Sequence, residues 1–239
     1  MQYYYLLILL LLLFALVIIY LETLTSYAIL PFNWVLYPSH TFDILLEEHQ
    51  DYFPYSKTLE ENYIKIRDEG WKLFEKHRNI NHLNYFSFDG LNKEGWTTLP
   101  LRLFGKDFNL ASEAPFTQSL IEDHPEIKSC IFSVMEPGKV IEEHTDPYTG
   151  IVRYQLPLDI PEGDCYLTVN HNNHYWKNGE GFIFDQHLLH GATNKSEKYR
   201  LVLLIDLAKK FDSSFKNKFN EMFISSLGFM PQTLLASLM

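Results

Sequence analysis

The feature that most constrains the fold is a series of short segments, rich in β-branched and aromatic residues, that begins at Ile127. We expect strands at 130–135, 152–158, 165–169, 181–185 and 200–207. Between them lie Pro137-Gly138, Glu162-Gly163-Asp164 and Asn178-Gly179, residues typical of tight turns. No helical pattern intervenes, so the segments predict an all-β sandwich or jelly roll, with the ligand site at the mouth or interior between the sheets.

Composition narrows the possible partners. The 239 residues are 46% hydrophobic and 15% aromatic, which is enough for one folded domain. The formal net charge of −10 argues against nucleic acid as a partner, because phosphate binding needs clustered Lys and Arg. Cys130 and Cys165 form no CxxC or zinc-finger spacing, so we interpret them as free thiols of the core. Nothing in the sequence indicates an oligomeric state.

The N-terminal segment predicts a membrane anchor at residues 1–22. Residues 3–20 contain no charge, Gly or Pro, and these eighteen residues would span about 27 Å as a helix, enough for a bilayer core. A cleaved signal peptide is the alternative, but the basic start and the small-residue cleavage site are missing. We therefore expect a single-pass membrane protein in a lipid bilayer. The first basic residue is Lys57, so the positive-inside rule leaves both orientations open.

After the anchor we expect three regions. Residues 23–79 combine a juxtamembrane connector with a helix over 56–79 that covers the domain. In the connector, Trp34, Tyr37 and Tyr52 either lie on lipid headgroups or pack against the domain. Residues 80–210 form the β domain, and residues 211–239 form a C-terminal helix or tail.

Histidine carries the candidate chemistry. A His-x-Asp pair occurs twice, and we interpret the first, His49 with Asp51, as structural because it lies in the connector, with no further candidate metal ligand at a useful place. The second, His144 with Asp146, lies within the β region, where residues two apart face the same side of an extended chain. An imidazole and a carboxylate so placed supply two ligands of a metal.

A third ligand completes the set that is typical of Fe(II) oxygenases. His190 follows the segment 181–185, and one more imidazole would complete a facial triad that leaves three metal positions open. Arg200 follows ten residues later, and its guanidinium suits a dicarboxylate cosubstrate. The rival metal ligands are His171, His174, Asp185 and His187, and the first two are expected to lie in a polar turn at residues 171–174.

Two stretches of the chain resemble a known family. IKSCIFSVMEPGKVIEEHTDPYTGIVRYQLPLDIPEGDCYLTV and GEGFIFDQHLLHGATNKSEKYRLVLLIDL resemble the aspartyl/asparaginyl β-hydroxylases, which are Fe(II)/2-oxoglutarate dioxygenases. The resemblance runs from about Gly95 to Asp206. The stretch HTDPYTGIVRY looks most like the membrane-anchored lipid A acyl-chain hydroxylases of this family, which also carry HxDP, whereas the animal peptide hydroxylases often lack the Asp.

The resemblance implies a fold, cofactors and site residues. It implies a double-stranded β-helix, or jelly roll, with flanking helices behind the N-terminal transmembrane helix. It makes His144, Asp146 and His190 the iron ligands and Arg200 the partner of the far carboxylate of 2-oxoglutarate, with O2 as the oxidant and ascorbate in support. It also implies pocket roles for Trp96, Ser133, Met135 and Arg153. Gln155 stands where the family commonly has His, which puts one polar contact in doubt.

The sequence leaves several functions open. The implied reaction is hydroxylation of an unactivated C–H bond, in either a lipid acyl chain or an Asp or Asn side chain of a protein. A zinc hydrolase would use the same three ligands but has no need for Arg200, and the sequence contains no HExxH. A catalytically inactive, membrane-tethered binding module is the other alternative, although all three ligands and Arg200 are present.

Overall fold

A computed structural model describes residues 31–37, 45–46, 49–78 and 94–229. The predicted anchor at 1–22 lies outside these residues. Among the helices that are described, none is both long and apolar enough to cross a bilayer.

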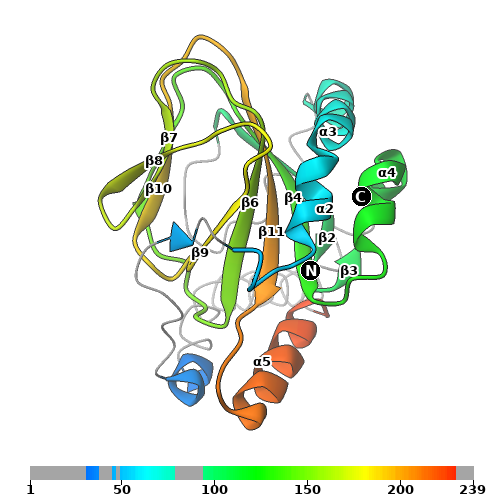
Figure 1. Ribbon diagram of the computed structural model, residues 1–239, viewed down its shortest axis with the longest axis vertical. Helices are drawn as coiled ribbons and strands as arrows, with labels where there is room; N and C mark the ends of the chain where they lie inside the picture. Colours follow the sequence, from blue (N-terminus) through cyan, green and yellow to red (C-terminus); the bar gives the residue numbers. More distant parts are fainter. Residues whose placement is uncertain (1–30, 38–44, 47–48, 79–93, 230–239) are drawn as a thin grey trace, which may run out of the picture.

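The described part of the chain is mainly β, as predicted, and it contains two antiparallel sheets that face each other (Figure 1). The larger sheet has the order β1-β9-β6-β11-β4-β2-β3. Its strands are β1 (Leu45–Leu46), β2 (Trp96–Leu103), β3 (Lys106–Asp107), β4 (Ile127–Met135), β6 (Ile151–Asp159), β9 (Phe182–Phe184) and β11 (Arg200–Ala208). The smaller sheet, in the order β5-β10-β7-β8, contains β5 (Val140–His144), β7 (Cys165–Val169), β8 (Asn172–Tyr175) and β10 (His190–Asn194).

The central strands of the larger sheet are buried on both faces, and alternation along them separates two cores. In β11, Leu201 and Leu203 point to the outer core, whereas Val202 and Leu204 point to the inner core between the sheets. In the paired strand β4, Phe132 belongs to the outer core in the same way. This alternation turns the odd-numbered residues of β4 and β6 and the even-numbered residues of β11 toward the smaller sheet.

Helices cover the outer face of the larger sheet (Figure 1). They are α2 (Ser56–Glu61), α3 (Tyr63–His77), the 3-10 helix η2 (Asn109–Glu113) and α4 (Pro115–Ile121). The covering helix predicted over 56–79 is thus present as two helices. They separate at Asn62, whose side-chain amide donates to the Thr58 carbonyl (2.8 Å). Helix α3 lies close to the sheet at Gly70, where an added Cβ would stand 2.8 Å from the Phe132 ring.

A third cluster of apolar residues lies at the lower end of the molecule in Figure 1. There the helical residues 31–36 pack against α5 (Ser214–Leu227), with the Phe32 and Phe223 ring centroids 4.0 Å apart. Helix α5 lies within the region expected to be a helix or tail, and the Ser213 hydroxyl caps its start by accepting from Lys216 N (3.4 Å).

The sequence located five strands but missed several others. Strands β1, β2, β3, β5, β8 and β10 were not predicted, because their segments are short or carry polar residues that strand patterns do not favour. The polar turn predicted at residues 171–174 is largely wrong. Asn170 and His171 do turn, with positive φ, but Asn172–Tyr175 form the edge strand β8. Cys130 and Cys165 are free and buried, as predicted.

Candidate metal and cosubstrate site

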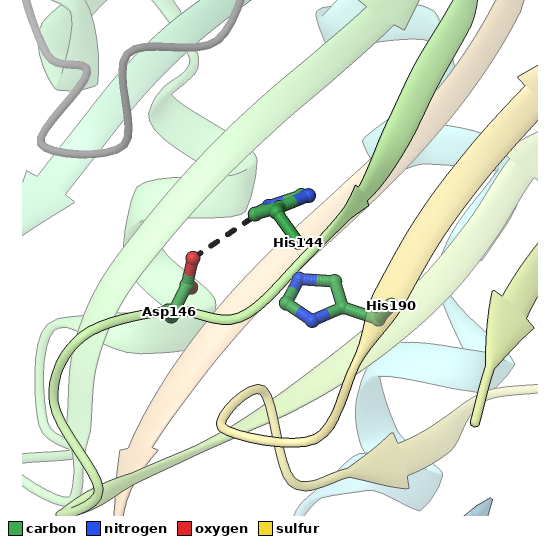
Figure 2. Close-up of side chains that lie close together, drawn as sticks. All are labelled: His144, Asp146 and His190. Atoms are coloured by element: carbon green, nitrogen blue, oxygen red, sulfur yellow. Dashed lines mark ion pairs between the residues drawn. The ribbon is translucent and has the colours of Figure 1, made fainter.

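The structure brings His144, Asp146 and His190 together (Figure 2). His144 ends β5, His190 begins β10, and the two residues are paired in the sheet register. Their ring centroids are 4.4 Å apart, and the three possible ligand atoms all lie within 4.8 Å of one another. One detail of the prediction is wrong, because Asp146 lies in the loop after β5 and not on extended strand. The ligand atoms converge nevertheless.

Both imidazoles are oriented by their own backbone. His144 Nδ1 donates to the Glu142 carbonyl (2.8 Å), and His190 Nδ1 donates to the Leu188 carbonyl (2.8 Å). With the proton on Nδ1, each Nε2 keeps its lone pair for a metal. Burial lowers the pKa of His190 to about 4, so this ring is neutral at physiological pH. The donor chemistry therefore fits a divalent metal ion.

The Asp146 carboxylate faces the same point. Its Oδ1 lies 3.7 Å from His144 Nε2, and its Oδ2 lies 3.8 Å from Arg153 Nη1. The backbone N–H of Asp146 donates to the Gln186 carbonyl (3.0 Å), which joins this loop to the segment that precedes His190. Two imidazoles and one carboxylate on neighbouring segments form the ligand set of a facial triad.

Two asparagines hold the loop that follows Asp146. Asn33 Nδ2 donates to the Pro147 carbonyl (2.7 Å), and Asn33 Oδ1 accepts from Thr149 N (3.0 Å). Asn220 Oδ1 accepts from the Tyr148 hydroxyl (2.6 Å), and the Asn220 amide donates to the carbonyl of residue 150 (2.7 Å). The loop is thus fixed by helices whose residues lie about 70 and 115 positions away in the sequence.

A pocket between the sheets adjoins the two histidines. Its polar lining comes from Trp96, Ser133, His144, Arg153, Gln155, His190 and Arg200. The remaining lining is Ile141, Leu167, Phe184, Gly191, Ala192 and Leu204. The predicted site residues Trp96, Ser133, Arg153 and Arg200 therefore line one pocket together with the two histidines.

Arg200 is a buried cation with an unsatisfied group. The residue is 2% exposed, and its Nε has no hydrogen-bond partner. Nη2 contacts the sulfur of Met135, and the guanidinium lies 4.8 Å from the centroid of the Trp176 ring. Burial lowers the pKa of Arg200 to about 10, so the group is still protonated at neutral pH. A buried guanidinium with no carboxylate partner in the described part of the chain is suited to an anionic ligand.

The other predicted pocket residues make contacts within the protein. Trp96 Nε1 donates to the Ser133 hydroxyl (2.9 Å), and Met135 supports Arg200 but does not line the pocket. Arg153 forms a bidentate pair with Asp206, with Nε to Oδ1 at 2.7 Å and Nη2 to Oδ2 at 3.1 Å. Its guanidinium is therefore already held by a carboxylate.

Sequence reasoning missed Trp176 and Asp206. Trp176 supports Arg200 from one side and donates its Nε1 to Gln155 Oε1 (2.9 Å). Gln155 thus stays within the pocket as an acceptor for Trp176. Asp206 could have been found from its place in β11, because an acidic residue in an otherwise apolar buried strand needs a partner.

The rival ligands are engaged elsewhere. Asp185 pairs with Lys209, and both residues are 2% exposed. His187 Nδ1 donates to the Asp146 carbonyl (3.1 Å), and His171 Nδ1 lies 3.2 Å from a Glu143 oxygen with its side chain 75% exposed. His174 packs edge-on against Phe182, with the ring centroids 4.4 Å apart. The connector histidine His49 is buried and contacts Glu60 (2.8 Å), away from the candidate ligands.

Comparison with known proteins identifies the family. The family model of aspartyl/asparaginyl β-hydroxylases matches residues 60–210. The ornithine lipid ester-linked acyl 2-hydroxylase of Rhizobium tropici is 30% identical over 167 residues, which cover 67% of this chain and 59% of that protein. The human aspartyl/asparaginyl β-hydroxylase is 30% identical over 159 residues, which cover 63% of this chain and 20% of that protein.

Among solved structures, a 2OG-Fe(II) oxygenase family oxidoreductase from Burkholderia pseudomallei aligns with a TM-score of 0.41 at 12% identity, over 55% of this chain and 76% of that one. Of the two sequence relatives, this chain spans about three fifths of the length of the lipid hydroxylase and about one fifth of the length of the human hydroxylase. The family model covers more than half of the chain and includes every candidate ligand and Arg200. The chain belongs to the aspartyl/asparaginyl β-hydroxylase family.

Proposed function

We propose that this hydroxylase is a membrane-anchored, Fe(II)- and 2-oxoglutarate-dependent dioxygenase that acts on an acyl chain of a membrane lipid. One observation carries the proposal. A metal-ligand set of two imidazoles and one carboxylate adjoins a pocket that also contains a buried guanidinium with an unsatisfied Nε. A metal together with a dicarboxylate cosubstrate uses both features, whereas a metal alone uses only the first.

Each residue has a physical role in this proposal. His144 and His190 present Nε2 lone pairs, and with the anionic ligand Asp146 they would hold the metal ion as a facial triad. Arg200 binds the far carboxylate of 2-oxoglutarate, and the Trp176 ring keeps its guanidinium in place. When bound, Fe(II) with 2-oxoglutarate and O2 supplies the oxidising power to hydroxylate an unactivated C–H bond, with succinate and CO2 as by-products.

Two observations favour an acyl chain as substrate. Of the two sequence relatives, the one that this chain covers more fully is named as a lipid acyl hydroxylase. The N-terminal apolar run predicts an anchor that would hold the domain at a membrane.

A protein side chain is the alternative substrate, because the human relative is an aspartyl/asparaginyl hydroxylase. In that case Arg153, which lines the pocket, is the cation that an acidic side chain of the substrate would meet. Its bidentate pairing with Asp206 leaves it less free to do so.

Two other functions are less well supported. A zinc hydrolase would leave the buried charge of Arg200 without a role. A binding module without activity would not need to keep two histidines whose Nδ1 atoms are each held by a carbonyl.

Succinate formation tests the proposal. The purified full-length chain in detergent is supplied with Fe(II), ascorbate and 2-oxoglutarate, and membrane lipid extract or peptide extract is then added. We expect the lipid extract to stimulate succinate formation in the wild type and no turnover in His190→Ala. Stimulation by the peptide extract alone would instead show that the substrate is a protein side chain. Iron-loaded, folded protein that forms no succinate with either extract would refute the dioxygenase.

A further inference from the structure

Large apolar side chains are exposed at one end of the described molecule. In the helical residues 31–36 and just after them, Trp34 is 86% exposed and Tyr37 is 72% exposed. On α5, Phe215 is 68% exposed and Met222 is 64% exposed. The two segments lie side by side at the lower end of Figure 1. An aromatic cluster of this kind is unusual on a surface that faces only water.

The exposed residues of α5 lie on one side of the helix. Phe215, Lys218 and Met222 follow at intervals of three and four residues, which places them near one face. Phe215 stacks on Phe219 with the ring centroids 6.1 Å apart, and Phe219 stacks on Phe32 at 5.7 Å. A row of stacked rings therefore connects α5 to Phe32 in the helical residues 31–36.

The charge around this face is opposite to that of the protein. The chain as a whole has a net charge of −10, but residues 209–222 contain four lysines against one aspartate and one glutamate, and that glutamate, Glu221, pairs with Lys128 (2.6 Å). Lys209 is buried, whereas Lys210 and Lys218 are exposed. Lys216 Nζ donates to the Tyr37 carbonyl (2.5 Å) and so ties the two segments together. Lysines beside exposed aromatic residues are typical of surfaces that lie at the membrane interface.

The position of this face in the chain points to the same partner. The apolar run that predicts an anchor ends at Tyr20, and the described helical residues begin at Pro31. The ten residues between them can span at most about 35 Å even when fully extended. If the run crosses a bilayer, Pro31 is therefore tethered within about 35 Å of the surface of that same bilayer.

We propose that Trp34, Tyr37, Phe215, Lys218 and Met222 form a docking face that binds the surface of a phospholipid bilayer with anionic headgroups. This inference rests on the proposed membrane anchor and deepens the proposed function. The helices that carry the face also supply Asn33 and Asn220, which hold the loop after Asp146. Docking therefore presents the candidate site to the bilayer in a fixed orientation, and a lipid substrate would need this.

A fluorescent probe on α5 tests the docking face. The full-length chain is reconstituted into vesicles of phosphatidylcholine and phosphatidylglycerol, with Met222→Cys labelled by a polarity-sensitive nitrobenzoxadiazole. The native cysteines are buried and do not compete for the label. Tyr175→Cys is the matched control, because Tyr175 is 55% exposed on β8, away from α5 in Figure 1. We expect nitroxide-labelled lipids to quench the probe at position 222 and not at position 175.

A charge variant tests the role of anionic lipid. Lys218→Glu should lower the ratio of docked to undocked domain at least about fivefold on vesicles with phosphatidylglycerol, because one lysine near an anionic surface is worth about that factor. On pure phosphatidylcholine the variant should match the wild type. An equal response on both vesicle types would overturn the electrostatic part of the proposal.

The outcomes separate the docking face from the anchor and from catalysis. A full-length chain that fails to float with vesicles would refute both the anchor and the docking face. The chain could float with the vesicles while nitroxide-labelled lipids quench the probe at position 222 no more than the probe at position 175. That result would overturn the docking face but not the anchor. A probe shielded without lipid, in proportion to protein concentration, would assign the face to a second copy. None of these readouts requires iron, so they do not depend on the succinate assay.

Discussion

The buried ion pair between Asp185 and Lys209 should be essential for stability. The two side chains are 2% and 1% exposed, and Lys209 Nζ lies 2.5 Å from Asp185 Oδ2. Burial lowers the pKa of Lys209, and the Asp185 carboxylate opposes that shift. Replacing Lys209 by Met would leave the carboxylate buried without its cation. Removing one partner of such a pair costs about 3–5 kcal/mol, which for a domain of this size lowers the melting temperature by roughly 6–20 °C.

The same pair also bears on the candidate metal site. Asp185 begins a segment, residues 185–188, that contacts two of the candidate ligands. The Gln186 carbonyl accepts from Asp146 N, and the Leu188 carbonyl accepts from His190 Nδ1. Loosening this segment should disturb two of the three ligands at once. Loss of groups that orient metal ligands typically weakens metal binding about 10–100-fold. We therefore expect Lys209→Met to weaken Co(II) binding by at least about tenfold.

Thermal unfolding, followed by near-UV circular dichroism, and a Co(II) titration measure these two effects on the full-length chain. Lys177→Met is the matched control, because Lys177 pairs with Glu180 on the surface and should contribute nothing measurable. The double variant Asp185→Leu/Lys209→Met removes both charges and should recover much of the lost stability. A loss of less than about 1 kcal/mol in Lys209→Met would refute the reasoning, because the carboxylate would then have found water or another partner.

Three further predictions concern the site and its support. Arg200→Lys should raise the KM for 2-oxoglutarate at least tenfold with little change in Co(II) affinity, because an ammonium group cannot bind a carboxylate through two parallel hydrogen bonds as a guanidinium does. If Co(II) affinity fell as much as the KM rose, the substitution would have disrupted the site in general. Gly191→Ala should destabilise the fold by about 1–3 kcal/mol in urea titrations, because the new Cβ would stand 2.7 Å from the Ile141 carbonyl oxygen. Unchanged stability would contradict the close approach of β10 and β5. Burial raises the pKa of Glu60, but hydrogen bonds from His49 and Tyr154 outweigh burial and lower that pKa overall. The carboxylate therefore contributes stability above about pH 4.3, the ordinary pKa of Glu in an unfolded chain. This contribution is lost as the pH falls through the lowered pKa of Glu60 in the folded protein. Glu60→Gln should therefore flatten the fall of unfolding free energy below that pH, and equal acid slopes in the two proteins would exclude this role for Glu60.

Local patterns in the sequence were sufficient for strands β4, β6, β9 and β11 of the larger sheet and for the choice of candidate ligands. The segment 200–207 is apolar on both faces because its strand is buried on both faces, and the structure has it as β11, Arg200–Ala208. His144, Asp146 and His190 were chosen from spacing and residue type, and the structure brings them within ligand distance of one another. Both inferences depend on neighbours in the chain, and a single sequence contains that information.

Only the tertiary structure decided how the site is supported. Asp146 lies in a loop, and its position depends on Gln186, Asn33 and Asn220, which are 40 to 113 residues away in the sequence. Trp176 supports Arg200 because β11 and the turn after β8 meet across the interior, which no local pattern predicts. Strand pairing and packing determine such contacts, since they require the whole fold to place distant segments side by side. The residue types that carry the chemistry were thus determined locally, whereas their orientation is a property of the assembled sheets.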